Sequence, residues 1–432
     1  MILSQNNFEF DINYLNEAKS IIELHMLAIK KNYNNEYISP LQYEDYLIVI
    51  SKFLSIADSK AKNEYIEIGY NLAKGIRQKL ELEYDFYKEP SMSSGLGYMC
   101  FSIHLFNKAT GLLGSFLKTL NKLLLDRCYS KVSSLMINNM LDTNTRHEDY
   151  DLANGASGVL YYLLDFDWED TDFKKIKVIG DYLITLSYEY EYDGLKVPKF
   201  HVKPENISNS DDKEIFQSGS LDFSIAHGII GPLITLAKLK CKTKGTKQLD
   251  VSINNILSLY NKFEMDYHNV ILWPTQLSIN ENLNKVRYSN QTSISNIFCG
   301  LSIANGLKNV SIYLENNILI KKYDNIMKNI LIYDYNMICL SNSIGHRAYL
   351  DIMISTYKET SDDIYLDNLY KTLSTIFDSF DPSLKHGFGF ESFEDIKIDN
   401  ISFSKGTSCI ILSLIGLLSN KSSNYENFLF LC

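Results

Sequence analysis

The chain has 432 residues, of which 45% are hydrophobic and 22% are charged, and its formal net charge is −10. A chain of this length and composition can bury a large core. Lys and Glu alternate along helical stretches instead of gathering into one basic stripe. This charge pattern excludes nucleic acid as an expected partner.

Neither a secretion signal nor a membrane span is predicted. The first residues lack the basic and apolar regions of a signal peptide, so we expect a cytoplasmic protein. The longest apolar run, Cys409–Leu418, is shorter than the roughly 20 residues that a spanning helix needs. The seven cysteines are scattered and never form a CxxC pair, which argues against a disulfide framework and a zinc ribbon.

Apolar residues recur at helical spacing along most of the chain, which predicts an all-α fold. The clearest amphipathic stretches are Tyr14–Lys31, Tyr43–Ile56, Tyr65–Leu80, Phe116–Met140, Phe173–Tyr188 and Asp363–Phe380. Their charged faces indicate helices that cover more apolar ones. The acidic segment Ser361–Asp367 lacks the spacing of a DDxxD motif and is interpreted as the capped start of a covering helix.

A second pattern is a small or polar turn with glycine, followed by a strongly apolar helix. Its six copies are Ser93–Phe106, Ala153–Leu164, Ser224–Leu239, Phe298–Leu307, Ser341–Met353 and Ser402–Leu418. Most start about 60 to 75 residues apart, with one interval nearer 45. The repeating unit is a hairpin of one inner and one outer helix, which must stack on its copies to bury its apolar face. The pattern predicts one closed or curved helical array.

Two long polar stretches, Val197–Gly219 and Val270–Asn296, interrupt these helices. We expect them to be loops that act as lids or contact a peptide.

Two ionisable residues, Asp151 in DLANGASG and His227 in AHGIIGP, each precede a GxxG turn that opens an inner helix. A single histidine beside a glycine is more often a capping or core residue. Because these two occupy equivalent positions in two repeats, both are expected to face the same space. They are the candidate acid/base pair.

Four segments together resemble the lanthionine synthetase C-like family of lanthipeptide (lantibiotic) biosynthesis. They are YDLANGASGVLYYLL, SIAHGIIGPLITLA, ILWPTQLS and ISFSKGTSCIILSL. The resemblance covers nearly the whole chain and is most specific where AHGxxGP follows YDxxxGxxG. It implies a single α,α-toroid domain over residues 1–432, built from about six to seven helical hairpins.

The resemblance also implies an activity. Family members join a cysteine thiol of a precursor peptide to dehydroalanine or dehydrobutyrine, which makes a thioether ring. In this role His227 would protonate the enolate carbon or manage the thiol proton, and Asp151 would hold it. Trp273 in ILWPTQLS and Arg287 are the implied substrate-binding residues, although Ser293 stands at the in-register position of the family's arginine.

The zinc ligands of the family are replaced in this chain. Its two cysteines and one histidine fall on Ile297, Leu340 and Ser341, so no zinc or other cofactor is expected. A shift of register would offer Cys299, Cys339 and His346 as ligands instead, but a buried free cysteine is the ordinary interpretation of the first two.

Three functions remain open from the sequence. The first is a thioether cyclase that works without a normal zinc site. The second is a non-catalytic relative that binds the precursor peptide or the modification complex. The third is another toroid enzyme, such as a glycosidase with paired carboxylates chosen from Glu391, Glu394 and Asp395. The expected partners are a dehydrated precursor peptide, a lanthipeptide dehydratase and a transporter complex, with possible peripheral membrane contact through that complex.

Overall fold

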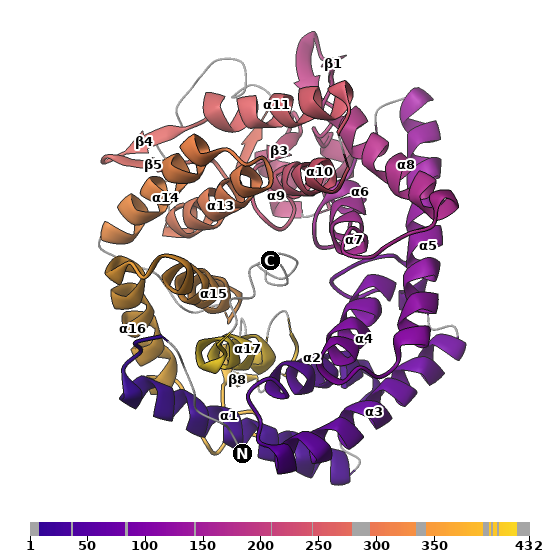
Figure 1. Ribbon diagram of the computed structural model, residues 1–432. Coiled ribbons are helices and arrows are strands. Elements are labelled where there is room, and N and C mark those ends of the chain that lie inside the picture. Colours follow the sequence, from indigo (N-terminus) through magenta and orange to yellow (C-terminus); the bar gives the residue numbers. More distant parts are fainter. Residues whose placement is uncertain are drawn as a thin grey trace. The chain divides into compact units, whose positions relative to one another are not determined.

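The chain folds into two compact units in which helices dominate (Figure 1). The computed structural model describes residues 8–35, 38–82, 85–141, 144–208, 210–243, 245–278, 294–333, 343–391, 397–398, 401–403 and 406–420. The first unit consists of residues 1–88, 94–120 and 339–432, and the second of residues 89–93 and 121–338. The single domain expected from the sequence stays a prediction, and each unit is described by itself.

In the first unit, helices buried on nearly every side pack against one another and are covered by amphipathic helices. The core helices are α2 (Tyr43–Phe53), α4 (Leu96–Thr110), α15 (Ser343–Thr360) and α17 (Thr407–Leu418). The cover helices are α1 (Ile12–Asn34), α3 (Ser59–Glu81) and α16 (Asp363–Asp378). Because α17 packs against both α1 and α2, the two ends of the sequence share one core (Figure 1).

The second unit repeats this arrangement. Its core helices are α7 (Ala156–Leu163), α10 (Ile230–Lys242) and α13 (Ile294–Tyr313). Its cover helices are α8 (Asp170–Leu186), α11 (Lys247–Lys262) and α14 (Asn317–Ile332). Helix α10 packs between α7 and α13. Helix α5 (Gly114–Leu141) begins in the first unit and continues in the second.

Short elements connect these helices. They are η1 (Pro40–Gln42), η2 (Asp85–Lys88), α6 (His147–Tyr150), η3 (Pro204–Asn206) and α9 (Ser210–Ile215). The strands are β1 (Glu189–Tyr192), β2 (Leu195–Pro198), β3 (Ser220–Asp222), β4 (Met265–Tyr267), β5 (Val270–Leu272), β6 (Gln276–Ser278), β7 (Phe390–Glu391) and β8 (Lys397–Ile398). They form four antiparallel pairs: β1 with β2, β3 with β6, β4 with β5, and β7 with β8.

The helices expected from periodicity are present, with ends shifted by a few residues. The clearest confirmation of a terminus is at α16, where the Asp362 carboxylate accepts a hydrogen bond from the Ile364 amide at 3.2 Å. That acidic segment is therefore a helix cap, as expected. The predicted loop Val197–Gly219 instead contains part of β2, η3 and α9, and Val202 bridges to Ser220.

The glycine pattern identifies most core helices but misses one. Helices α4, α7 and α17 follow glycine caps at Gly95, Gly155 and Gly406. Helix α2 instead follows the turn η1, which has no glycine, and was not among the six copies. In α13 the expected starting glycines lie inside the helix, where a Cβ on Gly300 would lie 2.5 Å from Cδ2 of Leu272.

Helices α7 and α10 are joined along their length. The Thr235 hydroxyl on α10 donates to the carbonyl of Ser157 on α7 at 3.1 Å, and both side chains are fully buried. Near the other end of both helices the side chain of Lys238 reaches the end of α7. This contact fixes the axial position of one helix against the other.

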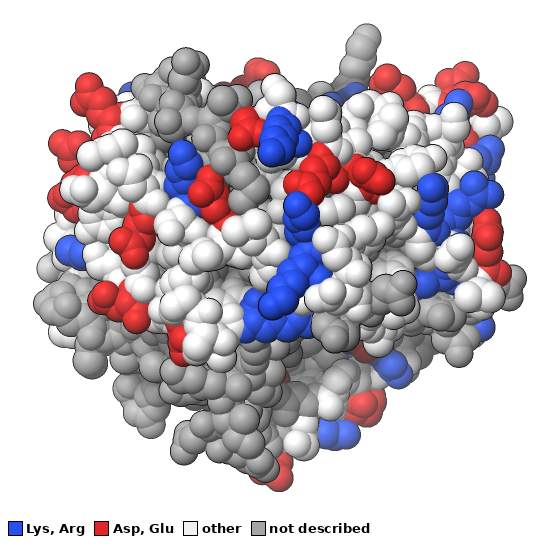
Figure 2. All heavy atoms as spheres, turned by 90° about the horizontal axis from the view of Figure 1, so that it is seen from below, with Lys and Arg blue, Asp and Glu red and all other residues white. Residues whose placement is uncertain are grey.

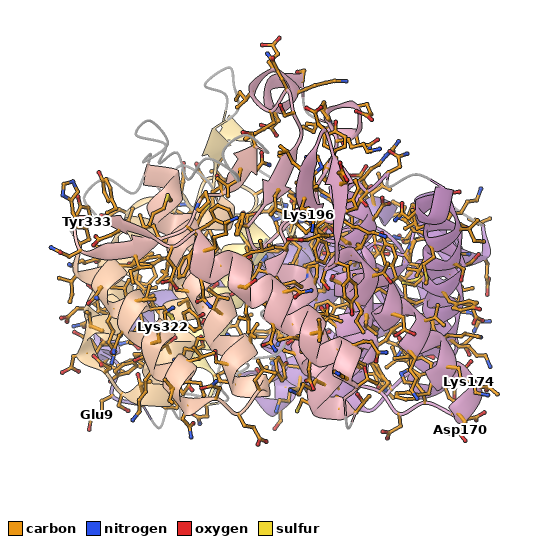
Figure 3. The ribbon with its side chains drawn as sticks, turned by 90° about the horizontal axis from the view of Figure 1, so that it is seen from above. Glu9, Asp170, Lys174, Lys196, Lys322 and Tyr333 are labelled. Atoms are coloured by element: carbon orange, nitrogen blue, oxygen red, sulfur yellow. The ribbon has the colours of Figure 1, made fainter. Side chains whose placement is uncertain are left out.

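The surface carries both charges. On the face seen in Figure 2, some Lys and Arg side chains form a short central row, others lie towards the edges near acidic side chains, and much of the remaining described surface is uncharged. Figure 3 shows Asp170 and Lys174 at the start of α8 and Lys322 on α14, all on cover helices. Over the residues that the structure describes, every helix is too short or too polar to span a membrane.

Candidate active site

Asp151 is the residue that ends α6 and leads into the turn before α7. Its side chain is 1% exposed. One carboxylate oxygen, Oδ1, accepts hydrogen bonds from the backbone amides of Asn154 at 2.6 Å and Gly155 at 2.8 Å. These amides lie at the amino end of α7, where unpaired N–H groups favour a negative charge. The carboxylate is therefore fixed in place by the helix that follows it.

His227 lies in the turn between β3 and α10, and its ring meets the second oxygen of Asp151. The distance from Nδ1 to Oδ2 is 2.7 Å. Because a carboxylate accepts, Nδ1 carries the proton, and Nε2 is the nitrogen available to a substrate. The His227 side chain is 51% exposed. The structure thus brings together the two residues that the sequence proposed, one buried and one open to solvent.

The hydrogen bond to Asp151 raises the pKa of His227 above its ordinary value, although burial acts in the opposite direction. The negative charges of Asp151, Asp222 and Glu148 add to the increase. The protonated ring is therefore favoured more than in a free histidine. Such a group can both take up and deliver a proton near neutral pH.

The glycines of both GxxG turns are needed for close backbone approach. A Cβ on Gly158 would lie 1.9 Å from the Leu152 carbonyl oxygen, and one on Gly228 would lie 2.3 Å from the Ser224 carbonyl oxygen. A Cβ on Gly231 would lie 2.8 Å from Cγ of Leu152, the neighbour of Asp151. The first two glycines shape their own turns, whereas Gly231 lets α10 approach the turn of Asp151.

A third acidic residue, Asp222, was not among the residues expected from the sequence. It is the last residue of β3 and is 4% exposed. Its Oδ1 accepts from the Ser224 amide at 2.6 Å, and its Oδ2 accepts from Nε2 of Gln276 at 3.3 Å. Only the pairing of β3 with β6 brings Gln276 next to it, so no local sequence signal marks this contact.

Polar side chains also lie beside the Asp151 turn. Oδ1 of Asn154 accepts from the hydroxyls of Ser93 at 2.6 Å and Ser91 at 3.0 Å. The amides of Met92 and Ser93 both donate to the Ala153 carbonyl. The serine-rich start of the first glycine repeat therefore packs against the candidate site, which its sequence alone did not indicate.

The two implied substrate-binding residues are not seen at the surface of the described site. Trp273 is 0% exposed, and its indole N–H donates to the Tyr260 carbonyl at 3.0 Å. In this conformation the ring is part of the core, beside the rings of Tyr260 and Tyr323. Arg287 lies outside the described residues, and so does Ser293. Their contact with substrate stays a prediction.

The residues at the family's zinc positions do not fit a zinc ion, because Ile297 and Leu340 have no donor atom and the third position, Ser341, offers only a hydroxyl. Leu340, Ser341 and Cys339 lie outside the described residues, as do the side chains of Ile297 and His346. Cys299 is described, and burial raises the pKa of its thiol to about 11. Among the described residues, no group of three His, Cys, Asp or Glu side chains is placed to hold a metal.

The carboxylates considered for a glycosidase are also outside the described part of the site. Glu391 is described only in its backbone, within β7, and Glu394 and Asp395 are not described. That alternative therefore gains no support from the described geometry.

Comparison with known proteins agrees with the motifs. The family model described as "Lanthionine synthetase C-like protein" matches residues 48–430. Among curated proteins, the nisin biosynthesis protein NisC of Lactococcus lactis subsp. lactis is 31% identical over 138 residues. That alignment spans 32% of this chain and 32% of the relative, about a third of the relative's length.

Among solved structures, nisin cyclase superposes with a TM-score of 0.74 at 19% sequence identity. The match covers 95% of this chain and 97% of that chain. The chain therefore shares the fold of that protein, and the expected all-α, α,α-toroid class is confirmed.

Proposed function

Because this chain belongs to the lanthionine synthetase C-like family, we propose that it closes thioether rings in a dehydrated lanthipeptide precursor. The observation that carries the proposal is the 2.7 Å hydrogen bond between buried Asp151 and half-exposed His227. A catalytic histidine needs one ring nitrogen held by a partner and the other open to the reactant. The pair has this arrangement.

The reaction requires a proton to move from sulfur to carbon. In ring closure the sulfur of a peptide cysteine bonds to the β-carbon of dehydroalanine or dehydrobutyrine, and the double-bond electrons move to the α-carbon and its carbonyl. Nε2 of neutral His227 would accept the thiol proton, and the imidazolium would return a proton to the α-carbon. Asp151 would accept the hydrogen bond from Nδ1–H throughout, which keeps the ring oriented. Atoms and charge balance without any further reagent.

This mechanism assigns no step to a metal. Only a few per cent of an ordinary cysteine thiol is ionised at neutral pH, so removal of the thiol proton by His227 would be the activating step. Holding the two ends of the ring together can contribute several kcal/mol to lowering the barrier. We expect purified protein to contain well under one zinc per chain, and elemental analysis that finds one tightly bound equivalent would contradict the ligand assignment.

The proposed partner is a dehydrated precursor peptide. Family membership also suggests a dehydratase and a transporter complex as partners, at which this chain would act in the cytoplasm or at the membrane surface. The segments around β3 and β6 adjoin the His227 turn, so we propose that they and the residues that follow β6 contact the peptide.

The test uses a synthetic peptide with one cysteine and one dehydroalanine a few residues apart. Ring closure does not change the mass, so the readout is the loss of thiol alkylation by N-ethylmaleimide in mass spectrometry. The wild-type chain should accelerate this loss over the uncatalysed reaction, and His227→Gln should reduce the acceleration by roughly 10²-fold or more. The matched control is His268→Gln, since His268 is an exposed histidine on the β4–β5 turn.

The competing function is a non-catalytic protein that binds the precursor, and the absence of zinc donors at Ile297 and Leu340 favours it. Fluorescence anisotropy with the labelled peptide separates the two. Binding by wild type and His227→Gln alike, with no acceleration of ring closure by either, would establish the binding function and refute the cyclase.

A further inference from the structure

The loop that carries His227 is closed at both ends by one residue, Asp222. Its side chain accepts from the Ser224 amide at 2.6 Å, and its backbone carbonyl accepts from the Ile229 amide at 2.9 Å. The Gly228 amide donates to the Ser224 carbonyl at 3.1 Å inside the loop. The seven residues between β3 and α10 are thus tied back to Asp222 at Ser224, three positions before His227, and at Ile229, two positions after it.

Asp222 is in turn anchored on the neighbouring strand. Nε2 of Gln276 on β6 donates to Oδ2 of Asp222, and the two residues are partners in the strand register. The Phe223 amide donates to the Thr275 carbonyl at 2.8 Å, one position away. The β3–β6 pair therefore fixes the position of the loop that carries His227.

The charge of Asp222 also reaches the site. The negative groups that act on the His227 ring are Asp151, which it contacts, and then Asp222 and Glu148. Asp222 also raises the pKa of Tyr150 and of Cys299, although burial is the main cause at both residues. A carboxylate that is 4% exposed is poorly screened, so its field extends further than that of a surface charge.

We propose that Asp222 is a positioning residue for His227, because it closes the loop that places the imidazole beside Asp151 and keeps a buried negative charge near that loop. A catalytic role of this positioning rests on the proposed function. The geometry of the loop and the pKa of His227 can be measured whether or not the protein closes rings. The competing interpretation is that Asp222 only closes a loop and has no influence on the titration of His227.

Asp222→Asn separates charge from shape. The asparagine oxygen can still accept from the Ser224 amide, and the Gln276 amide can turn so that its oxygen accepts from the new NH₂ group. The variant therefore removes the negative charge and keeps the loop closed. The measurement is the pKa of His227 by NMR titration of protein labelled with ¹³C-histidine, with the signal assigned through its loss in His227→Gln.

The expected result is a lower His227 pKa in Asp222→Asn than in the wild type. The pH dependence of ring closure should move to lower pH by the same amount. Gln276→Met keeps the charge and removes only the anchoring bond, so it should leave the pKa nearly unchanged. The matched control for net charge is Asp172→Asn, because Asp172 is a buried carboxylate on α8 that is not among the charges acting on His227.

An unchanged pKa in folded Asp222→Asn would overturn the inference, even if ring closure slowed. A shifted pKa in a wild-type protein that closes no ring would support the inference and refute the proposed function. Asp222→Ala removes the charge and the loop closure together. If that variant does not fold, the asparagine variant still decides the question.

Discussion

Lys238 on α10 donates from Nζ to the backbone carbonyl of Tyr161 on α7 at 2.8 Å, and the same ammonium lies 3.8 Å from the centre of the Tyr161 ring. Asp165 supplies the counter-charge at 2.8 Å, with its own side chain 46% exposed. The Lys238 side chain is 2% exposed. A buried ammonium thus neutralises the carbonyl end of the neighbouring core helix.

The first prediction follows from this contact. Lys238→Met keeps the buried hydrocarbon but leaves the Tyr161 carbonyl without its donor, so it should lower the free energy of unfolding by about 1–3 kcal/mol. Asp165 is partly in solvent and can be rehydrated, which limits the loss. Urea denaturation measures the effect. The control is Lys240→Met, two positions after Lys238 on α10, which removes an ion pair with Asp250 at the surface. It should change the free energy of unfolding by no more than about 0.5 kcal/mol. Equal losses in the two variants would contradict a stabilising role for the buried Lys238 contact.

The second prediction concerns acid. Burial, together with nearby His386, lowers the pKa of His25 to about 3. In the unfolded chain His25 is protonated below about pH 6.5, whereas in the folded chain it stays neutral down to about pH 3. Because of this difference, His25 lowers the free energy of unfolding as the pH drops from about 6.5 towards 3. Between about pH 6.5 and 5, the wild type should lose about 2 kcal/mol more of its free energy of unfolding than His25→Leu does. Denaturation at several pH values measures how steeply the free energy of unfolding depends on pH. The control variant His268→Gln, which replaces an exposed histidine, should show the same pH dependence as the wild type.

The third prediction concerns the pair itself. Because Asp151 raises the pKa of His227 above its ordinary value, the pair stabilises the fold below about pH 6.5, and this contribution disappears as pH rises through the folded pKa. Asp151→Asn should therefore be destabilising by more at about pH 6 than at about pH 9. Denaturant midpoints of the two proteins at both pH values provide the comparison. A difference that grows with pH would show that the pair does not hold the proton as described.

The fourth prediction uses two helical glycines. A Cβ at Gly231 would press on Leu152 beside Asp151, whereas one at Gly416 in α17 meets nothing within 4 Å. Gly231→Ala should cost about 1–3 kcal/mol of stability and slow ring closure by moving the two turns apart. Gly416→Ala should instead gain about 0.5–1 kcal/mol. Thermal unfolding with the alkylation assay checks both, and a neutral Gly231→Ala would mean that close helix approach does not position the pair.

Local patterns were enough to predict the helices and to single out Asp151 and His227, because each residue precedes a GxxG turn within about eight residues of the chain. Their pairing was expected from their equivalent places in two repeats and from the family resemblance. Helix α2 does not match the glycine pattern, because the turn η1 with Pro40 precedes it in place of the usual glycine. In both cases the local backbone, more than the long-range packing, decided what the sequence could reveal.

Other features depend on contacts between distant residues and could not be predicted in this way. Asp222 stands in an ordinary three-residue strand, and its anchoring bond comes from Gln276, 54 positions later, which no local pattern indicates. The hairpin of β1 and β2 was not among the expected elements, although a local pattern marks its turn. Asp193 and Gly194 have positive φ angles of 52° and 74°, and Asp-Gly between alternating apolar residues is a strong indication of a hairpin turn.

The bonds between α7 and α10 limit how the site can respond to a peptide. The Thr235 hydroxyl donates to the Ser157 carbonyl near the start of α7, and Lys238 donates to the Tyr161 carbonyl near its end. With these two attachments, α7 can neither slide nor turn against α10 without breaking buried hydrogen bonds, and the Gly155 amide of its cap holds the Asp151 carboxylate. The Asp151 carboxylate, which accepts the hydrogen bond from His227, therefore has a fixed position. Any adjustment to thioether rings of different size must come from the loop that carries His227 and from the bound peptide.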